Sequence, residues 1–187
     1  MHHALRFYSV HQELILRFYM LAAKFTMLPV IGNPVKSLMQ WYALSWHKAW
    51  ILTPEEAKKI INAATSVAVG DCKCRKIYNN CDGPIRTDIV IGIGYNVFTE
   101  VRKDEYIEIS KEEAQEIIDE CKRLGLIQTL AKCRKEAYAI CNCCTCCCIP
   151  LRLSKVYGIR DSLSRDKNVV SDFIVKLQHG SVPADQN

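Results

Sequence analysis

Thiol side chains are concentrated in two short stretches of this 187-residue chain. Six of the eight residues from Cys141 to Cys148 are cysteine, and Cys72, Cys74 and Cys81 form a smaller group upstream. Adjacent cysteines suit a disulfide framework poorly, because a disulfide needs a specific Cα separation and Cβ direction. Thiolates crowded into one loop are instead typical ligands of a soft metal ion or an iron–sulfur cluster. The pattern therefore predicts a metal-binding protein.

Nine of the eleven cysteines are predicted to be cofactor and metal ligands. One cubane cluster takes four thiolates, so nine thiols can supply two clusters, one unusual cluster, or one cluster plus free reactive thiols. Cys121 lies on the apolar face of an expected helix and is assigned to the core, while Cys133 is left undecided. The predicted ligands are Cys72, Cys74, Cys81, Cys141, Cys143, Cys144, Cys146, Cys147 and Cys148.

An iron–sulfur cofactor is favoured over zinc, which stays the alternative. Zinc sites commonly use two CxxC pairs or mixed Cys and His sets. Here no CxxC stands apart from the dense block, and all five histidines lie far from the cysteines in sequence. Arg75, Lys76 and Arg152 lie beside the cysteines; they could offset thiolate charge, but solvated surface positions are expected for them.

Local signals predict the elements that carry these thiols. Two capping boxes, Thr53 to Glu56 and Ser110 to Glu113, predict helices over residues 53–64 and 110–124. A buried strand over 66–69 then leads to the first cysteine group, which is expected in a loop before a strand over 89–93. In extended chain Cys72 and Cys74 would point to the same side and reach one metal centre.

The second half of the chain reads as a helix followed by two short strands, over 126–130 and 137–140, and a helix from Pro150 to about Tyr157. This order predicts an α+β fold with a winged-helix-like segment and cysteine-rich metal loops. Adjacent cysteines cannot share one side of a strand, so the second block is expected in an irregular loop or at a helix start.

The first 52 residues are apolar, aromatic and basic, and predict a helical hairpin over 14–31 and 34–50. The expected units are this extension (1–52), a cysteine-rich cluster domain (53–178) and a mobile tail (179–187). We expect the hairpin to pack on the cluster domain; a peripheral membrane or partner contact is the alternative.

Charge and cysteine pattern narrow the class of protein. The net charge is +5, but nearly all the excess lies in the first 53 residues, and the neutral remainder argues against a nucleic-acid partner. No signal peptide is evident and the number of cysteines is odd, which favours a reducing cytoplasm.

Five ordered motifs resemble a cysteine-rich module of anaerobe proteins that precedes 4Fe-4S ferredoxin domains. The resemblance covers residues 53 to 170 and implies a 4Fe-4S cofactor. The ferredoxin half, with its CxxCxxCxxxCP run, is absent, and Gln128 stands where the family usually has a histidine. The motifs are Cys72-Lys73-Cys74-Arg75, Cys81-Asp82-Gly83-Pro84, Ile109 to Ala114, Gly125-Leu126-Ile127, and Ile140 to Cys148.

The leading hypothesis is therefore an iron–sulfur protein that exchanges electrons with a redox protein partner, or that holds a cluster within a larger redox complex. A sulfur- or metal-handling protein or enzyme with reactive thiolates is the first alternative. A zinc-stabilised interaction or DNA-binding module is the second. Whether the chain is an enzyme is left open.

Overall fold

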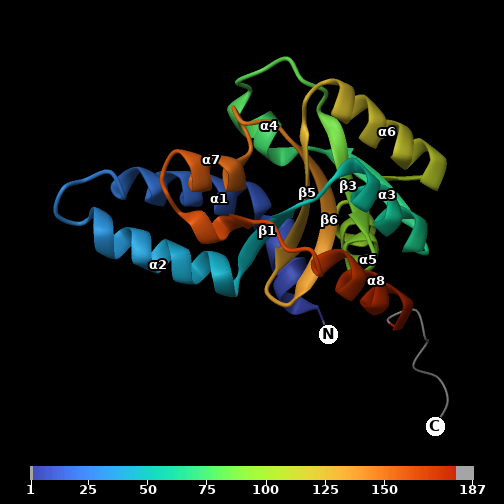
Figure 1. Cartoon of the computed structure of the whole chain (residues 1–187), viewed down its shortest axis with the longest axis horizontal. Helices are drawn as coiled ribbons and strands as arrows, with labels where there is room; N and C mark the ends of the chain where they lie inside the picture. The colour runs from blue at the N-terminus through green and yellow to red at the C-terminus, as the bar shows by residue number, and fades with distance from the viewer. Residues whose placement is uncertain (1, 180–187) are drawn as a thin grey trace, which may run out of the picture.

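A computed structural model describes residues 2–179, which form one seven-stranded mixed sheet with helices on both faces (Figure 1). The strand order is β4-β2-β3-β6-β5-β1-β7, and every neighbouring pair is antiparallel except β1 and β7. The α+β class is confirmed. The strands are β1 (His47–Ile51), β2 (Val67–Asp71), β3 (Arg86–Ile91), β4 (Ile107–Ile109), β5 (Ile127–Cys133), β6 (Glu136–Cys143) and β7 (Leu163–Ser164). The helices are α1 (His3–Phe25), α2 (Gly32–Ser45), α3 (Pro54–Ala63), α4 (Lys73–Tyr78), α5 (Ile93–Val101), α6 (Lys111–Arg123), α7 (Ile149–Lys155) and α8 (Val169–His179), with a 3₁₀ turn η1 (Arg160–Ser162).

The alternation of side chains along the central strands divides the core between the two faces of the sheet. In β3, Ile89 and Ile91 pack against α3, α6 and α8, whereas Val90 packs against α1 and α5. Because successive strand residues point to opposite faces, an apolar strand of this kind must be covered on both sides. The helices of Figure 1 supply that cover.

The two predicted capping boxes are confirmed. Thr53 and Glu56 exchange side-chain and backbone hydrogen bonds at the start of α3, and Ser110 and Glu113 do the same at the start of α6. The predicted order of a helix and two paired strands is present as α6, β5 and β6, and these strands lie in the middle of the sheet. Gly125, with a φ of +71°, ends α6 in a left-handed conformation that favours glycine.

Two local predictions are corrected, and one helix was not predicted. The second N-terminal helix ends at Ser45, and residues 47–50, predicted as the end of that helix, belong to β1, which pairs with β5. Residues 73–78, predicted as loop, form the short helix α4. Residues 93–101 form α5, which the sequence analysis did not predict. Pairing with a distant strand overrides local preference in the first case, because tertiary context dominates weak propensities.

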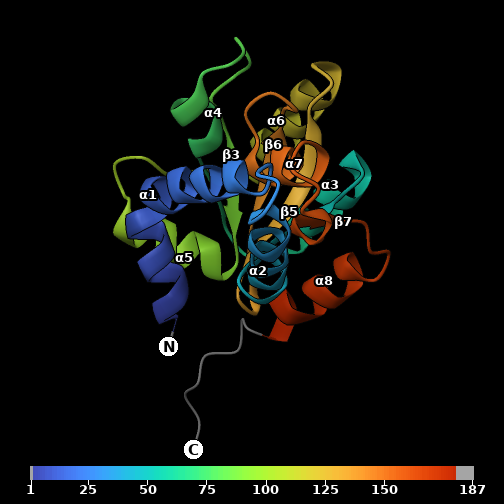
Figure 2. The ribbon, with the colours of Figure 1, turned by 90° about the vertical axis from the view of Figure 1, so that its left-hand side faces the viewer.

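The N-terminal helices form the predicted hairpin and pack on the cysteine-bearing part of the chain. The predicted bounds of the first helix, 14–31, are wrong, because α1 begins at His3 and ends at Phe25, where a turn leads to α2. Leu16, Met20 and Met39 share a buried cluster with Ile149 and Leu153 of α7. Helix α1 bends at His11, whose backbone is not helical, and Figure 2 shows the bend. No helix within residues 2–179 combines the length and apolar content needed to cross a bilayer. The tail predicted as mobile lies, from residue 180, outside the described residues.

Candidate metal centre

Four cysteine thiols meet where the loops after α4 and β6 come together, and we call them the outer thiol group: Cys81, Cys144, Cys146 and Cys147. All four Sγ atoms lie within 4.8 Å of one another. The Cys81 Sγ atom is 3.7 Å from that of Cys144 and 3.9 Å from that of Cys147. The Sγ atoms of Cys146 and Cys147 are 3.8 Å apart. Four cysteines are thus positioned to bind a metal ion.

Two polar contacts of Asn80 hold these loops together. The backbone N–H of Asn80 donates to Cys147 Sγ at 3.3 Å, and the Asn80 side-chain amide donates to the Cys146 carbonyl at 3.0 Å. The preceding residue, Asn79, has a φ of +44° and ends α4 in the left-handed conformation that asparagine tolerates. This turn directs Cys81 towards the loop that follows β6.

The spacing of the outer thiols fits one tetrahedral ion. A metal ion with sulfur bonds of about 2.3 Å holds its four thiolates about 3.8 Å apart. The three Sγ separations of 3.7 to 3.9 Å agree with that geometry. A cubane cluster spreads its ligands further, because each thiolate binds a different iron atom. Four soft donors in this arrangement suit iron or zinc.

A buried cation lies beside the outer thiols. Arg75 is 1% exposed, so the prediction of a solvated Arg75 is wrong. Its Nη1 atom donates to the Pro84 carbonyl and, at 3.3 Å, to Thr87 Oγ1. Its Nη2 atom donates to the Asn142 carbonyl at 2.9 Å. The guanidinium thereby joins α4, the loop after it and β6, and it places positive charge where thiolates gather.

This charge affects the outer thiols directly. Burial opposes ionisation of Cys144, but hydrogen bonds from the Cys146 thiol and the Arg75 guanidinium outweigh it and lower the pKa of Cys144 to about 6. Burial and hydrogen bonding within the group raise the pKa of Cys146 to about 12. A lowered pKa at Cys144 favours metal binding, because a thiol must lose its proton before it can bind a metal ion.

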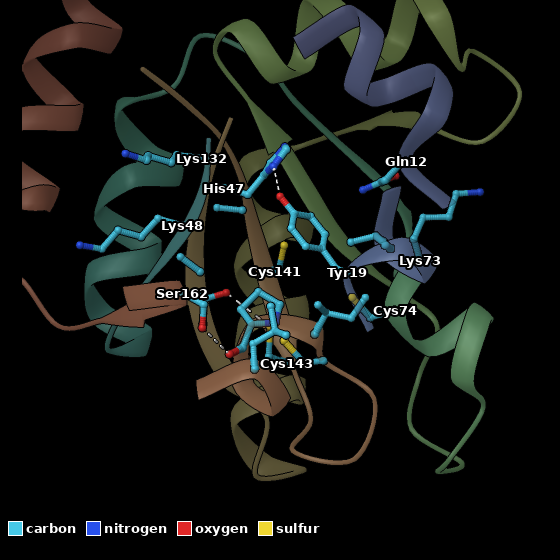
Figure 3. Close-up of a pocket in the computed structure, with 18 of the residues that line it drawn as sticks. Gln12, Tyr19, His47, Lys48, Lys73, Cys74, Lys132, Cys141, Cys143 and Ser162 are labelled. Carbon is cyan, nitrogen blue, oxygen red and sulfur yellow. Dashed lines mark hydrogen bonds between the residues drawn. The ribbon is translucent and has the colours of Figure 1, made fainter. Parts of the chain in front are cut away.

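The other five predicted ligands lie apart from the outer group, on a cavity of about 90 Å³ between the sheet and helices α1, α2 and α7. We call them the inner thiol group. Figure 3 shows Cys74, Cys141 and Cys143 directed into this cavity. The members are Cys72, Cys74, Cys141, Cys143 and Cys148.

The inner thiols form a chain of contacts. Cys72 is hydrogen-bonded to Cys74, Cys74 to Cys148, and Cys148 to Cys143. Donation from the Cys148 and Cys72 thiols stabilises the Cys74 thiolate and holds its pKa well below the ordinary value. Cys141 stands aside from the chain: its thiol donates to Asp88 Oδ1 at 3.1 Å.

The elements explain how the two groups are separated. Cys141 and Cys143 lie in β6 and face the same side, since strand side chains alternate. Cys72 and Cys74 were predicted to share one side of an extended segment. That prediction is wrong, because the two residues lie at the start of helix α4. Asn142 points to the opposite face, where its amide accepts from Gln128 Nε2 at 3.1 Å. Gln128, at the position where the resembled family has a histidine, therefore contacts neither thiol group.

Two cysteines belong to neither group. Cys121 is 1% exposed on α6, as predicted for a core residue. Cys133, left undecided from the sequence, is buried at the end of β5, with its Sγ atom 3.9 Å from the Ala4 carbonyl oxygen. Burial raises the pKa of both thiols, to about 11 and about 12. Asp88 and its partner Tyr106, whose hydroxyl donates to Asp88 Oδ2 at 2.7 Å, were not predicted as neighbours of the site, and no local pattern marks them.

The fold and the site together define an α+β protein in which four cysteines are positioned to hold a metal ion. Comparison with known protein families, with curated proteins and with solved structures gives no match for this chain. Its chemistry is therefore argued from the geometry of the two thiol groups.

Proposed function

We propose that this chain is an iron–sulfur protein that transfers electrons, with the outer thiol group holding a single iron ion near the surface. The observation that carries the proposal is the convergence of Cys81, Cys144, Cys146 and Cys147, whose Sγ atoms lie within 4.8 Å of one another. Tetrahedral sets of four sulfur ligands are characteristic of iron–sulfur and zinc sites.

The surroundings of the outer thiols support exchange of charge with a partner. Cys81, Cys144 and Cys146 are only partly buried, so a redox protein can approach closely. Iron held by these four thiolates would supply a one-electron couple for exchange with a redox protein partner. The fixed Arg75 guanidinium offsets part of the negative charge of four thiolates in either state.

A structural zinc site is the second candidate, and the same spacing favours it. Zinc also takes four thiolates with bonds of about 2.3 Å. An ion bound to Cys81 and to the loop of Cys144 to Cys147 would join two segments that are distant in sequence. In this case the outer thiols stabilise the fold and carry no electrons.

Metal analysis of protein purified without oxygen separates the two candidates. We expect about one ion per chain to depend on the outer thiols, with visible thiolate-to-iron absorption that changes on reduction. In Cys81→Ser that ion should be lost, whereas the matched control Cys133→Ser, a buried cysteine outside both groups, should keep it. Stoichiometric zinc and no iron at the outer thiols would refute the electron-transfer proposal.

A further inference from the structure

We infer that the inner thiol group is a second centre, which binds a polynuclear iron–sulfide cluster through Cys72, Cys74, Cys143 and Cys148. This inference rests on the iron chemistry of the proposed function and adds a separate site with a different cofactor.

The dense cysteine block divides its thiols between the two groups. Cys143 and Cys144 are neighbours in sequence, yet the first lines the inner cavity and the second belongs to the outer group. Cys147 and Cys148 divide in the same way. Because β6 ends at Cys143 and α7 begins after Cys148, the chain passes from one centre to the other and back within six residues.

The inner thiols are too widely spread for one ion. Within residues 2–179, the outer thiols are the only set of three or more potential ligands whose atoms all lie within 4.8 Å of one another. Cys72, Cys74, Cys143 and Cys148 instead line one cavity of about 90 Å³, and no three of their Sγ atoms all lie within 4.8 Å of one another. A cluster in which each thiolate binds its own iron atom suits such a ring of separated donors.

The remaining groups around the cavity fit a buried cluster. Leu16, Met39 and Ile149 contribute apolar lining that keeps water away. Cys141 is set apart because its thiol donates at 3.1 Å to the buried Asp88 carboxylate, whereas Cys143 Sγ lies 3.4 Å from the neutral Thr129 hydroxyl. Four thiolates then remain, the number that a cubane cluster takes.

The test uses the full chain, reconstituted without oxygen with ferrous iron and sulfide, and measures iron and acid-labile sulfide per chain. We expect about four sulfides in the wild type. The inner variant Cys74→Ser/Cys148→Ser should lose the sulfide and keep about one ion at the outer thiols. The outer variant Cys81→Ser/Cys146→Ser should keep the sulfide, and so should the control Cys141→Ala.

The outcomes separate the two proposals. Iron without sulfide in the wild type, or sulfide lost with the outer variant and kept with the inner one, would overturn the second centre. Zinc at the outer thiols together with sulfide that depends on Cys74 and Cys148 would refute the outer iron and support the inner cluster. Circular dichroism checks each fold, and the single variant Cys72→Ser replaces the double variant where that one does not fold.

Independently of the thiols, helix α1 presents an exposed apolar stripe, and we propose that it binds the surface of an anionic lipid bilayer. Beyond the bend at His11 the stripe residues recur every three or four positions, the spacing of one helix face, and Phe7 and Val10 extend the apolar surface before the bend. They are between 43% and 68% exposed, although large apolar residues are normally covered in a folded chain. The stripe is formed by Phe7, Val10, Leu14, Phe18, Leu21 and Phe25.

The apolar surface continues onto the turn between α1 and α2. Met27 and Val30 are 66% and 87% exposed there, and Figure 1 shows the turn projecting at one end of the molecule. A projecting apolar turn can enter a lipid interface directly, whereas a protein partner would need a matching groove. The opposite face of α1 packs on the core, so the stripe is a separate surface.

The charges of α1 suit anionic headgroups. The helix carries Arg6, Arg17 and Lys24, all exposed, against the single acid Glu13. Arg6 and Arg17 form ion pairs with Glu100 and Glu13. Exposed pairs of this kind contribute little, so headgroup phosphates can replace the acids. Basic residues beside an exposed aromatic and aliphatic face are typical of helices that lie in the membrane interface.

Co-sedimentation of the holoprotein with vesicles tests this surface. We expect binding to vesicles of phosphatidylcholine with phosphatidylglycerol, weakened by salt, and on the order of tenfold less binding for Leu14→Glu/Phe18→Glu. Leu124→Glu is the matched control, because Leu124 is 51% exposed and lies outside the stripe. The proposal is overturned if the wild type does not bind or if the stripe variant binds equally well. It is also overturned if the wild type is a dimer that the stripe variant disperses, a result that would assign the stripe to a second copy of the chain.

Discussion

The inner and outer thiol groups each take cysteines from both cysteine-bearing segments and yet differ in backbone setting, shape and charge. The outer thiols lie on two loops and converge within 4.8 Å; three of the four are partly exposed and Cys147 is buried. The inner thiols lie on β6 and at the starts of α4 and α7, surround a cavity and are covered by α1. Neighbouring cysteines therefore have different environments because the backbone changes from strand to loop to helix between them.

The difference shows what each environment can do. A compact, accessible set of thiols suits one ion that exchanges with solvent or with a partner. A spread, buried set suits a larger group protected from water. Arg75 links the two groups. It lies beside the outer thiols, and its Nη2 atom donates to the carbonyl of Asn142, which lies between the inner cysteines Cys141 and Cys143.

Arg75→Leu should give the largest change in stability. The substitution leaves buried acceptors at Pro84, Thr87 and Asn142 without their donor. We expect the free energy of unfolding to fall by about 3 to 5 kcal/mol, measured by urea denaturation of the metal-free chain. The outer ion should also bind more weakly, since the cation that stabilises the Cys144 thiolate is gone.

Lys76→Leu is the control for that substitution. Lys76 lies on the same helix but is exposed, and it pairs with Asp71 at 3.0 Å. An exposed pair contributes about 0 to 1 kcal/mol, so stability and metal binding should change little. Equal losses in both variants would show that α4, and not the guanidinium, is the sensitive feature.

Metal removal should separate the two groups by rate. A chelator reaches the outer thiols on their two loops in the folded state, whereas the inner thiols line a cavity between the sheet and helices α1, α2 and α7, so release from it needs local opening of those helices. We expect the outer ion to leave on the order of tenfold faster than iron from the inner cavity, followed by absorption during chelator treatment. Identical rates would mean that one opening event exposes both groups.

The parts of the fold that were predicted correctly depend on local chemistry. The capping boxes at Thr53 and Ser110 act within four residues, so the sequence alone indicates where α3 and α6 begin. Strand β1 was missed because its formation depends on β5, about eighty residues away in sequence. A strand whose partner is that distant carries little local signal.

The candidate site shows the same division. Residue type alone identified the nine cysteines, since thiols at this density indicate metal chemistry. Their separation into two groups depends on the register of β6 against β3 and β5 and on the packing of α1, which are tertiary properties. The burial of Arg75 was missed for that reason: its partners come from three separate segments.

Tyr106→Phe probes the polar neighbours of the inner group. Tyr106 is buried, and its hydroxyl donates to Asp88 at 2.7 Å, while Cys141 donates to the other carboxylate oxygen. Removing the hydroxyl should cost about 1 to 3 kcal/mol of unfolding free energy, because a buried acceptor loses one donor. Sulfide bound at the inner thiols should stay unchanged. A loss of sulfide in this variant would make Asp88 and Cys141 part of the inner centre.

The smallest effect is expected from Cys121→Ala. Cys121 is a fully buried thiol on α6 that contacts neither group, and it behaves as a small apolar side chain. Its replacement removes one sulfur atom from the core and should lower the free energy of unfolding by about 1 kcal/mol, with iron and sulfide contents unchanged. Cys133→Ala, a second buried cysteine outside both groups, should behave in the same way. A loss of metal in either variant, with native circular dichroism, would contradict this assignment. It would show that a cysteine outside the two groups is also a ligand.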